Sequence, residues 1–315
     1  MVSNAIECKL SPTLLKVAHT ITVSASGRGN FTTITGALES IPVNNDKWIR
    51  IFVMPGTYNE KIKIKDKECI FVEGQSRRTT TISFDSCNDT ADSTTFAVYS
   101  DNFLAKNIAF KNSYNRKARS DTDQKIAPAV AFGSFGDKHA FYGCGFEGYQ
   151  DTLWDEKGHH YFKSCYIEGA VDFIWGAGQS VYEGCLINVT GEGYITAQGR
   201  NSSTDTNGYV FNYCTVLGTG HADLGRPYRA YSRVIFLNSM FTKVVNPQGW
   251  SIWCQQGHEN DITFAEVNCV GPGSSAHHKH ERISWMKKLK RSELGQYSTK
   301  AFIDSDGWIS KLPIH

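Results

Sequence analysis

Two aspartates with matching sequence surroundings are the strongest candidates for chemistry in this chain of 315 residues. Asp151 lies seven residues after Cys144, and Asp172 lies seven residues after Cys165, so both acids occupy the same place in a repeated phrase. If the repeats stack as parallel strands, the two acids lie side by side on strands about 4.8 Å apart. Carboxyl groups this close titrate as a coupled pair, in which one proton leaves easily and the other is retained. Such a pair can carry out acid and base chemistry on one substrate.

The residues around the two acids bring further groups that a ligand site needs. Gln150 precedes one acid and supplies an amide donor, while Trp154, Phe173 and Trp175 follow the acids and supply flat apolar surface. A ladder of solvated aspartates or a set of turn caps is the structural alternative for acids at this spacing. Because charged, amide and aromatic groups occur together here, we favour a ligand-binding site over a ladder of solvated aspartates or turn caps.

The two acids belong to a repeated sequence motif, and the fold of this repeat must position them. Its landmark residues are small, namely Cys144, Cys165, Cys185, Cys214 and Ser239, with Asn107 in an upstream version. The steps between the landmarks from 144 to 239 are 21, 20, 29 and 25 residues, which is a solenoid period. Each unit is rich in Val, Ile, Phe, Tyr and Thr and is broken by Gly, Asn or Asp, so it predicts strands joined by turns. We therefore predict an all-β fold, a single-stranded right-handed parallel β-helix with projecting loops and a C-terminal helical segment.

The landmark residues should form one inward column, in which cysteine packs as a compact hydrophobe. The chain has nine cysteines, and their spacing includes no Cys-x-x-Cys pair that would suggest a zinc site. The spacing of these cysteines does not by itself predict a disulfide within the column.

Two segments should lie outside the solenoid coils. The stretch from Lys111 to Ala127 is polar and aperiodic, which predicts a projecting loop. The stretch from His277 to Arg291 is basic and carries Ile283, Met286 and Leu289 at helical spacing, which predicts an amphipathic helix packed on the solenoid.

The composition limits the class of protein. The chain has 33 Lys and Arg against 31 Asp and Glu, which gives a net charge of +2. This charge is too small to indicate a nucleic acid partner. No apolar run is long enough for a membrane span, and no signal peptide is visible. We expect an N-terminal extension over residues 1–20, a single catalytic domain over residues 21–315, a monomer and no metal. Four N-x-S/T sequons suit a secreted glycoprotein, and they begin at Asn30, Asn88, Asn188 and Asn201.

Four motifs, in order, resemble the signatures of the pectinesterase (pectin methylesterase) family. They are Gly56-Thr-Tyr58-Asn-Glu60, Gln150-Asp151-Thr152-Leu153, Asp172-Phe173-Ile174-Trp175-Gly176 and Leu224-Gly225-Arg226-Pro227-Tyr228. The resemblance covers roughly residues 20 to 310 and is greatest to plant enzymes of the cell wall. In the first motif, Tyr58 and Glu60 are expected to hold an early turn.

The resemblance implies hydrolysis of the methyl ester at C6 of galacturonate units in homogalacturonan, with release of methanol and without a cofactor. By motif, Asp172 would be the nucleophile and Asp151 the general acid and base. Arg226 would hydrogen-bond Asp172 and leave the shared proton on Asp151, and Gln150 would donate to the oxyanion.

The same resemblance implies an extended sugar-binding surface and a place of action. Trp175, Tyr228, Trp250 and Phe173 would contact the pectin chain, and the enzyme would be secreted to the cell wall, or apoplast. Besides homogalacturonan, a proteinaceous inhibitor is a second candidate partner.

One departure from the family pattern bears on activity. Pro128 stands where the family has a glutamine that donates to the oxyanion, and proline has no such donor. Losing one oxyanion donor typically costs about 10²–10³ in turnover, unless another group such as Gln124 replaces it. Trp175 and Tyr228 also replace a usual Phe and a usual Trp, but both keep an aromatic face.

Other functions remain as alternatives. Pro128 motivates a pectin-binding homologue with little or no activity. Closely spaced carboxylates also suit a β-helix glycoside hydrolase, and a lyase acting on the same polymer is a further rival. A serine esterase would need Gly-x-Ser-x-Gly, which the sequence around Gly133 and Ser134 does not match.

Overall fold

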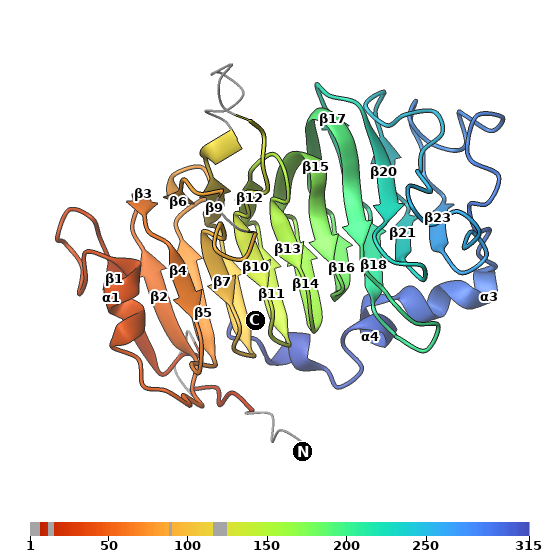
Figure 1. Ribbon diagram of the computed structural model, residues 1–315. Coiled ribbons are helices and arrows are strands. Elements are labelled where there is room, and N and C mark those ends of the chain that lie inside the picture. Colours follow the sequence, from red (N-terminus) through yellow and green to blue (C-terminus); the bar gives the residue numbers. More distant parts are fainter. Residues whose placement is uncertain (1–6, 12–15, 88–89, 116–124, 315) are drawn as a thin grey trace.

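The computed structural model describes residues 7–11, 16–87, 90–115 and 125–314. Within them, parallel strands stack into the coils of a β-helix, as Figure 1 shows. The all-β fold and the right-handed parallel β-helix are therefore as predicted. No helix among these residues is both long and apolar enough to cross a membrane.

The first sheet runs along one side of the stack. In the described residues it has ten parallel strands, in the order β1 (His19–Val23), β2 (Ile49–Val53), β5 (Ile70–Gly74), β8 (Phe103–Lys106), β11 (His139–Tyr142), β14 (His159–Lys163), β16 (Gln179–Glu183), β18 (Gly208–Asn212), β21 (Arg233–Leu237) and β23 (Thr263–Val267). Because each coil contributes one strand, neighbours in this sheet are successive turns of the solenoid.

The second sheet wraps around the rest of the coil. One half contains β3 (Gly56–Asn59), β6 (Thr80–Phe84), β9 (Ala109–Asn112), β12 (Gly145–Glu147), β19 (Thr215–Gly218) and β22 (Met240–Phe241). The other half contains β4 (Ile62–Ile64), β7 (Phe96–Val98), β10 (Phe132–Ser134), β13 (Leu153–Asp155) and β20 (Ala222–Pro227). The long strands β15 (Tyr166–Gly176) and β17 (Leu186–Gln198) belong to both halves and join them.

The interior is filled by columns of side chains in register. Rings from successive first-sheet strands stack with centroids 4.4 to 4.6 Å apart, in the order Phe141, Phe162, Tyr182, Phe211 and Phe236. Large aromatic side chains bury much apolar area, so this ladder stabilises the coils that carry the site.

The predicted cysteine column is present, with one correction. Cys144, Cys165, Cys185 and Cys214 are buried and are free thiols, and Ser239 is buried as well. Asn107 was wrongly placed in this column, because strand pairing sets Lys106 opposite Tyr142 and Ala109 opposite Gly145, which leaves Ile108 opposite Cys144. Asn107 instead occupies the left-handed turn position one residue earlier, at a φ of 55°.

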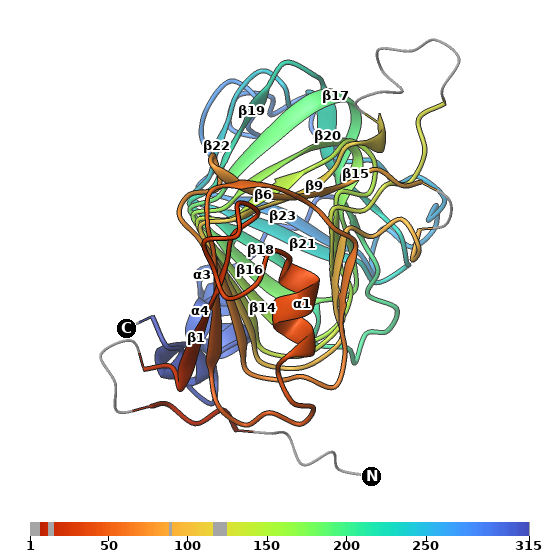
Figure 2. The same ribbon diagram turned by 90° about the vertical axis from the view of Figure 1, so that its left-hand side faces the viewer.

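The N-terminal end of the solenoid is covered by helix α1 (Ile34–Glu39), which lies across the open coil in Figure 2. Ile34, Ala37 and Leu38 are buried against the core. The carboxylate of Glu60 accepts hydrogen bonds of 2.8 Å from the backbone amides of Ile34 and Thr35, so Glu60 caps this helix.

The predicted helix from His277 to Arg291 is wrong over most of its length. Residues 277–290 are turns and extended chain, because their amides bond to other coils: Ile283 N donates to Gln248 O at 3.2 Å, and Lys287 N donates to Phe264 O at 2.8 Å.

Helical turns begin only at α3 (Arg291–Leu294) and continue through η1 (Gly295–Tyr297), α4 (Thr299–Phe302) and η2 (Trp308–Lys311). This helical segment packs on the outer face of the first sheet through Tyr297, Phe302, Trp308 and Leu312. At the other end of the chain, a disulfide joins Cys8 to Cys69 and ties the segment before β1 to the turn before β5.

The predicted loop from Lys111 to Ala127 is described only in part. Lys111 and Asn112 belong to β9, and residues 116–124, which include Gln124, lie outside the described residues.

Candidate active site

The two predicted acids lie on neighbouring rungs of the solenoid. Strands β13 and β15 pair Leu153 with Ile174, and an isolated bridge pairs Gln150 with Val171, so Asp151 stands opposite Asp172. The amide of Asp151 donates to the carbonyl of Val171 at 3.0 Å, which fixes this register.

Both acids have a backbone conformation that is uncommon for residues with a side chain. The φ angles of Asp151 and Asp172 are 60° and 48°, in the left-handed region. Aspartate tolerates this region better than most residues, and such strain is found preferentially at functional sites. It interrupts the strand alternation at the same point of two coils, where β15 also loses regular pairing with β17 between Gly169 and Ile174.

An arginine from a later coil bonds to one of the two acids. Arg226 of β20 follows Trp175 and Ala197 in one register column. Its Nε donates to Asp172 Oδ1 at 2.8 Å, and its Nη2 donates to Asp172 Oδ2. This bidentate contact joins two little-exposed groups, since the side chains are 17% and 11% exposed.

The electrostatics make the two acids unequal. Burial raises the pKa of Asp151 to about 7, and the charge of Asp172 adds to this rise while Arg226 opposes it. Burial also raises the pKa of Asp172, but the hydrogen bonds and charge of Arg226 act in the opposite direction. Because the guanidinium bonds directly to Asp172, the arrangement favours an ionised Asp172 beside a protonated Asp151.

Aromatic side chains border the acids on several sides. Trp175 Nε1 donates to the carbonyl of Asp151 at 3.4 Å, and its ring stacks on Trp154 with centroids 4.3 Å apart. On the far side, Arg226 lies 4.1 Å from the ring centroid of Trp253, which stacks in turn near Tyr228 at 6.1 Å.

The sequence prediction of the sugar-contacting residues is corrected at two positions. Trp175 is half-buried and Tyr228 is exposed, so both rings keep accessible surface beside the acids. Phe173 and Trp250 have 0% and 1% exposure and lie in the core, so their rings offer no surface to a polysaccharide. Trp253, which the sequence analysis missed, borders the site instead.

Two positions that bear on oxyanion binding, 150 and 128, lie on the rung of Asp151 and on the rung before it. Gln150 immediately precedes Asp151 and is half-buried. The amide of Ala129 donates to the carbonyl of Gln150 at 3.2 Å, which places Pro128 on the preceding rung next to this position. The ring nitrogen of Pro128 has no hydrogen to donate, as the sequence implies.

A second polar cluster is sealed inside the same coils. Ser134 Oγ lies 3.2 Å from His160 Nε2, and His160 Nδ1 lies 2.5 Å from Asp155 Oδ1. This order of groups is that of a serine hydrolase triad, but all three residues are 0% exposed. Since no substrate can reach Ser134, the cluster is a structural network, and the hydroxyl of Tyr182 completes it by donating to Asp155 Oδ2 at 2.5 Å.

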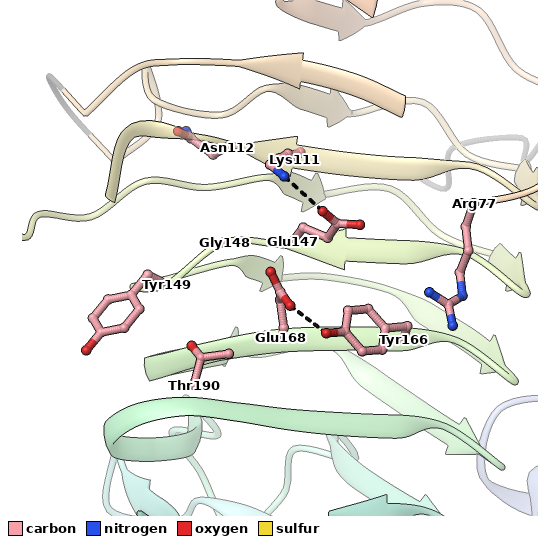
Figure 3. Close-up of a pocket in the computed structure, with 9 residues that line it drawn as sticks. All are labelled: Arg77, Lys111, Asn112, Glu147, Gly148, Tyr149, Tyr166, Glu168 and Thr190. Atoms are coloured by element: carbon pink, nitrogen blue, oxygen red, sulfur yellow. Dashed lines mark hydrogen bonds and ion pairs between the residues drawn. The ribbon is translucent and has the colours of Figure 1, made fainter. Parts of the chain in front are cut away.

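A cavity of about 460 Å³ lies on the other half of the second sheet, as Figure 3 shows. Its two carboxylates are satisfied locally, because Lys111 bonds Glu147 at 3.1 Å and the Tyr166 hydroxyl donates to Glu168 at 2.5 Å. Neither Asp151 nor Asp172 lines it. This cavity is therefore separate from the acidic pair.

Comparisons with known proteins agree with the motifs. The family model described as Pectinesterase matches residues 20–306. Probable pectinesterase 29 of Arabidopsis thaliana is 48% identical over 301 residues, which cover 93% of this chain and 89% of that protein. Probable pectinesterase 55 of the same plant is 46% identical over 320 residues, covering 98% and 96%. The structure of pectin methylesterase from carrot matches with a TM-score of 0.85 and 27% identity, over 94% of this chain and 96% of that one.

Proposed function

The chain belongs to the pectinesterase family, and from this membership we propose that its acidic pair hydrolyses the methyl esters of pectin. The chain is thus a carboxylic-ester hydrolase. The observation that carries the assignment of residues is the in-register pair of Asp151 and Asp172, with Arg226 bonded to Asp172.

In the first half of the reaction, the ionised carboxylate of Asp172 attacks the ester carbonyl carbon of a galacturonate unit. The carbonyl oxygen becomes an oxyanion, to which the amide of Gln150 donates a hydrogen bond. When the bond to the methoxy oxygen breaks, Asp151 gives its proton to that oxygen, and methanol leaves. The galacturonyl group remains as an anhydride with Asp172.

In the second half, Asp151 is ionised and takes a proton from water. The hydroxide formed attacks the galacturonyl carbon, and the anhydride bond to Asp172 breaks. The products are a free galacturonate carboxyl group, an ionised Asp172 and a protonated Asp151, so the pair returns to its starting state. A pKa of about 7 suits Asp151 to both transfers at neutral pH.

Three rings beside the acids are proposed to hold the polymer. Trp175 and Tyr228 keep accessible faces, and Trp253 lies between Tyr228 and Arg226. Aromatic faces pack well against the apolar faces of sugar rings. The rival assignments, an inactive pectin-binding protein or a glycosidase or lyase, are not favoured by the family match.

The direct test measures methanol released from highly methylated pectin, beside an assay for new reducing ends. Asp172→Asn should abolish methanol release, because the amide is no nucleophile. Asp205→Asn changes an exposed acid outside the site and is the matched control. Near-normal methanol release by a folded Asp172→Asn protein would refute the nucleophile assignment, and new reducing ends without methanol would identify a glycosidase or lyase.

We also propose secretion to the cell wall, where the polymer lies. The disulfide between Cys8 and Cys69 suits an oxidising compartment. Of the sequons, Asn30 and Asn201 are exposed, whereas Asn188 is half-buried and its amide donates to the Tyr166 hydroxyl at 2.9 Å. Asn88 lies outside the described residues. Mass spectrometry of the plant-expressed protein should therefore find a higher glycan occupancy at Asn30 and Asn201 than at Asn188.

A further inference from the structure

We propose that the coils on the N-terminal side of the acidic pair form an extended subsite that binds unesterified galacturonate units of the pectin chain. In this subsite, Lys63 and Lys65 contact the free carboxylates. The proposal rests on the proposed function and adds a preference for substrate that is already partly demethylated.

The subsite follows from the register of the second sheet. Lys63 of β4 pairs with Ala97, Ala97 with Gly133, Gly133 with Trp154, and Trp154 with Trp175. These positions form one column that ends beside the acids. Four strand spacings separate Lys63 from Trp175, which amounts to about 19 Å. A strand spacing is comparable with the length of one sugar unit, so the column matches the direction and scale of a polymer lying along the solenoid.

A continuous row of rings connects this column with the acids. Tyr99 stacks on Phe135 with centroids 4.5 Å apart, and Phe135 contacts Trp154 edge-on at 4.8 Å. Trp154 then stacks on Trp175, which bonds the carbonyl of Asp151. Tyr99 is 36% exposed, and Phe135 and Trp154 are half-buried, so the row presents apolar surface outward.

Gly133 allows one of these rings to lie where it does. A Cβ atom at Gly133 would approach Cε2 of Phe135 to 2.5 Å. The ring of Phe135 therefore lies over the bare backbone of Gly133, between Tyr99 and Trp154.

The far end of the row carries positive charge. In β4 the isoleucines Ile62 and Ile64 are buried, while Lys63 of this strand and Lys65 just after it are exposed. The Nζ atoms of both lysines lie 5.0 Å from the ring centroid of Tyr99. Among the described residues, neither lysine forms an ion pair with a carboxylate. Two like charges over one ring repel each other, and an anionic ligand would relieve that repulsion.

The charges select between two forms of the same sugar unit. A methylated galacturonate unit is neutral, whereas the demethylated unit carries a carboxylate that can pair with an ammonium group. The rings can pack on either form, so the lysines supply the discrimination. The lysine of the Figure 3 cavity is different, because Lys111 is already paired with Glu147.

The test compares pectins of high and low methylation in the methanol-release assay. The double variant Lys63→Gln/Lys65→Gln should raise KM for sparsely methylated pectin about fivefold, with kcat unchanged, because exposed charge pairs contribute modestly. KM for highly methylated pectin should change less than twofold, and added salt should remove the difference between wild type and variant. The control Lys243→Gln/Lys279→Gln removes two exposed lysines elsewhere.

A binding measurement keeps this proposal separate from the catalytic one. Calorimetric titration with unesterified oligogalacturonate should show affinity for the wild type that falls about fivefold in the lysine variant and not in the control. Tyr99→Leu should weaken binding of methylated and unmethylated chains alike, since it removes stacking and not charge. Equal effects of the lysine variant on both pectins, or unchanged binding, would overturn the subsite. A wild type that binds as expected but releases no methanol would refute the proposed function alone.

Discussion

Replacing Arg226 tests the electrostatic asymmetry of the acidic pair. Arg226→Gln removes both hydrogen bonds and the positive charge from Asp172. A hydrogen bond to a charged group contributes about 1.5–3 kcal/mol, and after allowance for the partial exposure of both partners we take the loss as about 3 kcal/mol. At 1.36 kcal/mol for each pKa unit, this raises the pKa of Asp172 by about two units.

The pH profile of kcat/KM reports this change. Asp172 must be ionised, so activity rises as the pH climbs through its pKa, and Asp151 must start protonated, so activity falls above about pH 7. Arg226 lowers the pKa of both acids, so its removal moves both limbs to higher pH. Below the rising limb, the ionised fraction of Asp172, and with it kcat/KM, should fall about 100-fold.

The control for this experiment is Arg229→Gln. Arg229 is exposed and lies 5.3 Å from the ring centroid of Tyr228, so its removal takes away a nearby charge without touching the acids. If Arg226→Gln leaves both limbs in place, or if Arg229→Gln moves them equally, the reasoning from the bidentate contact is wrong.

Three further changes test other parts of the structure. Asp151→Asn should abolish activity, and it should raise the melting temperature at pH 8 but not at pH 3. The folded protein raises the pKa of Asp151 from 3.8 to about 7, so ionisation of this carboxyl group lowers the free energy of unfolding as the pH rises through that range. Equal shifts of the melting temperature at both pH values would contradict this. Pro128→Gln should raise kcat for methanol release if position 128 faces the oxyanion, and an unchanged or lower kcat would place the second donor elsewhere. Cys8→Ser should lower the free energy of unfolding by up to about 4 kcal/mol, because the disulfide spans 61 residues, with kcat/KM unchanged; a protein of undiminished stability would show that the extension is not held by this bond.

The acidic pair could be placed from the sequence because a solenoid repeats its local geometry. Cys144 and Cys165 mark the same turn in two successive coils, and seven residues later each coil has reached the same position on its own rung. The same reasoning failed for Asn107, because asparagine readily adopts the left-handed conformation of the turn position that precedes the inward-facing residue. Without a cysteine in that coil, the sequence could not fix the register to one residue.

The direction of aromatic side chains was harder to predict. The left-handed conformation of Asp172 interrupts the strand alternation, so Phe173 and Ile174 are both buried and Trp175 is the first ring to reach the surface. Trp253 lies in an irregular turn with no periodicity to reveal it. In the C-terminal stretch, the spacing of Ile283 and Met286 is compatible with a helix and also with an extended chain. The chain is extended there because its amides bond to other coils.

In the coils that begin at Gly143, Ser164, Gly184, Tyr213 and Asn238, a left-handed residue followed by a buried small residue sets the register of the strands that come after it. Adding one residue between Cys144 and Asp151 would swing that carboxyl group toward the other face of its strand and separate it from its neighbour. Adding residues within 156–158, the turn between β13 and β14, would enlarge only that turn. Changes in chain length can therefore accumulate on one side of each coil and not on the other, and a library of single-residue insertions would trace that boundary.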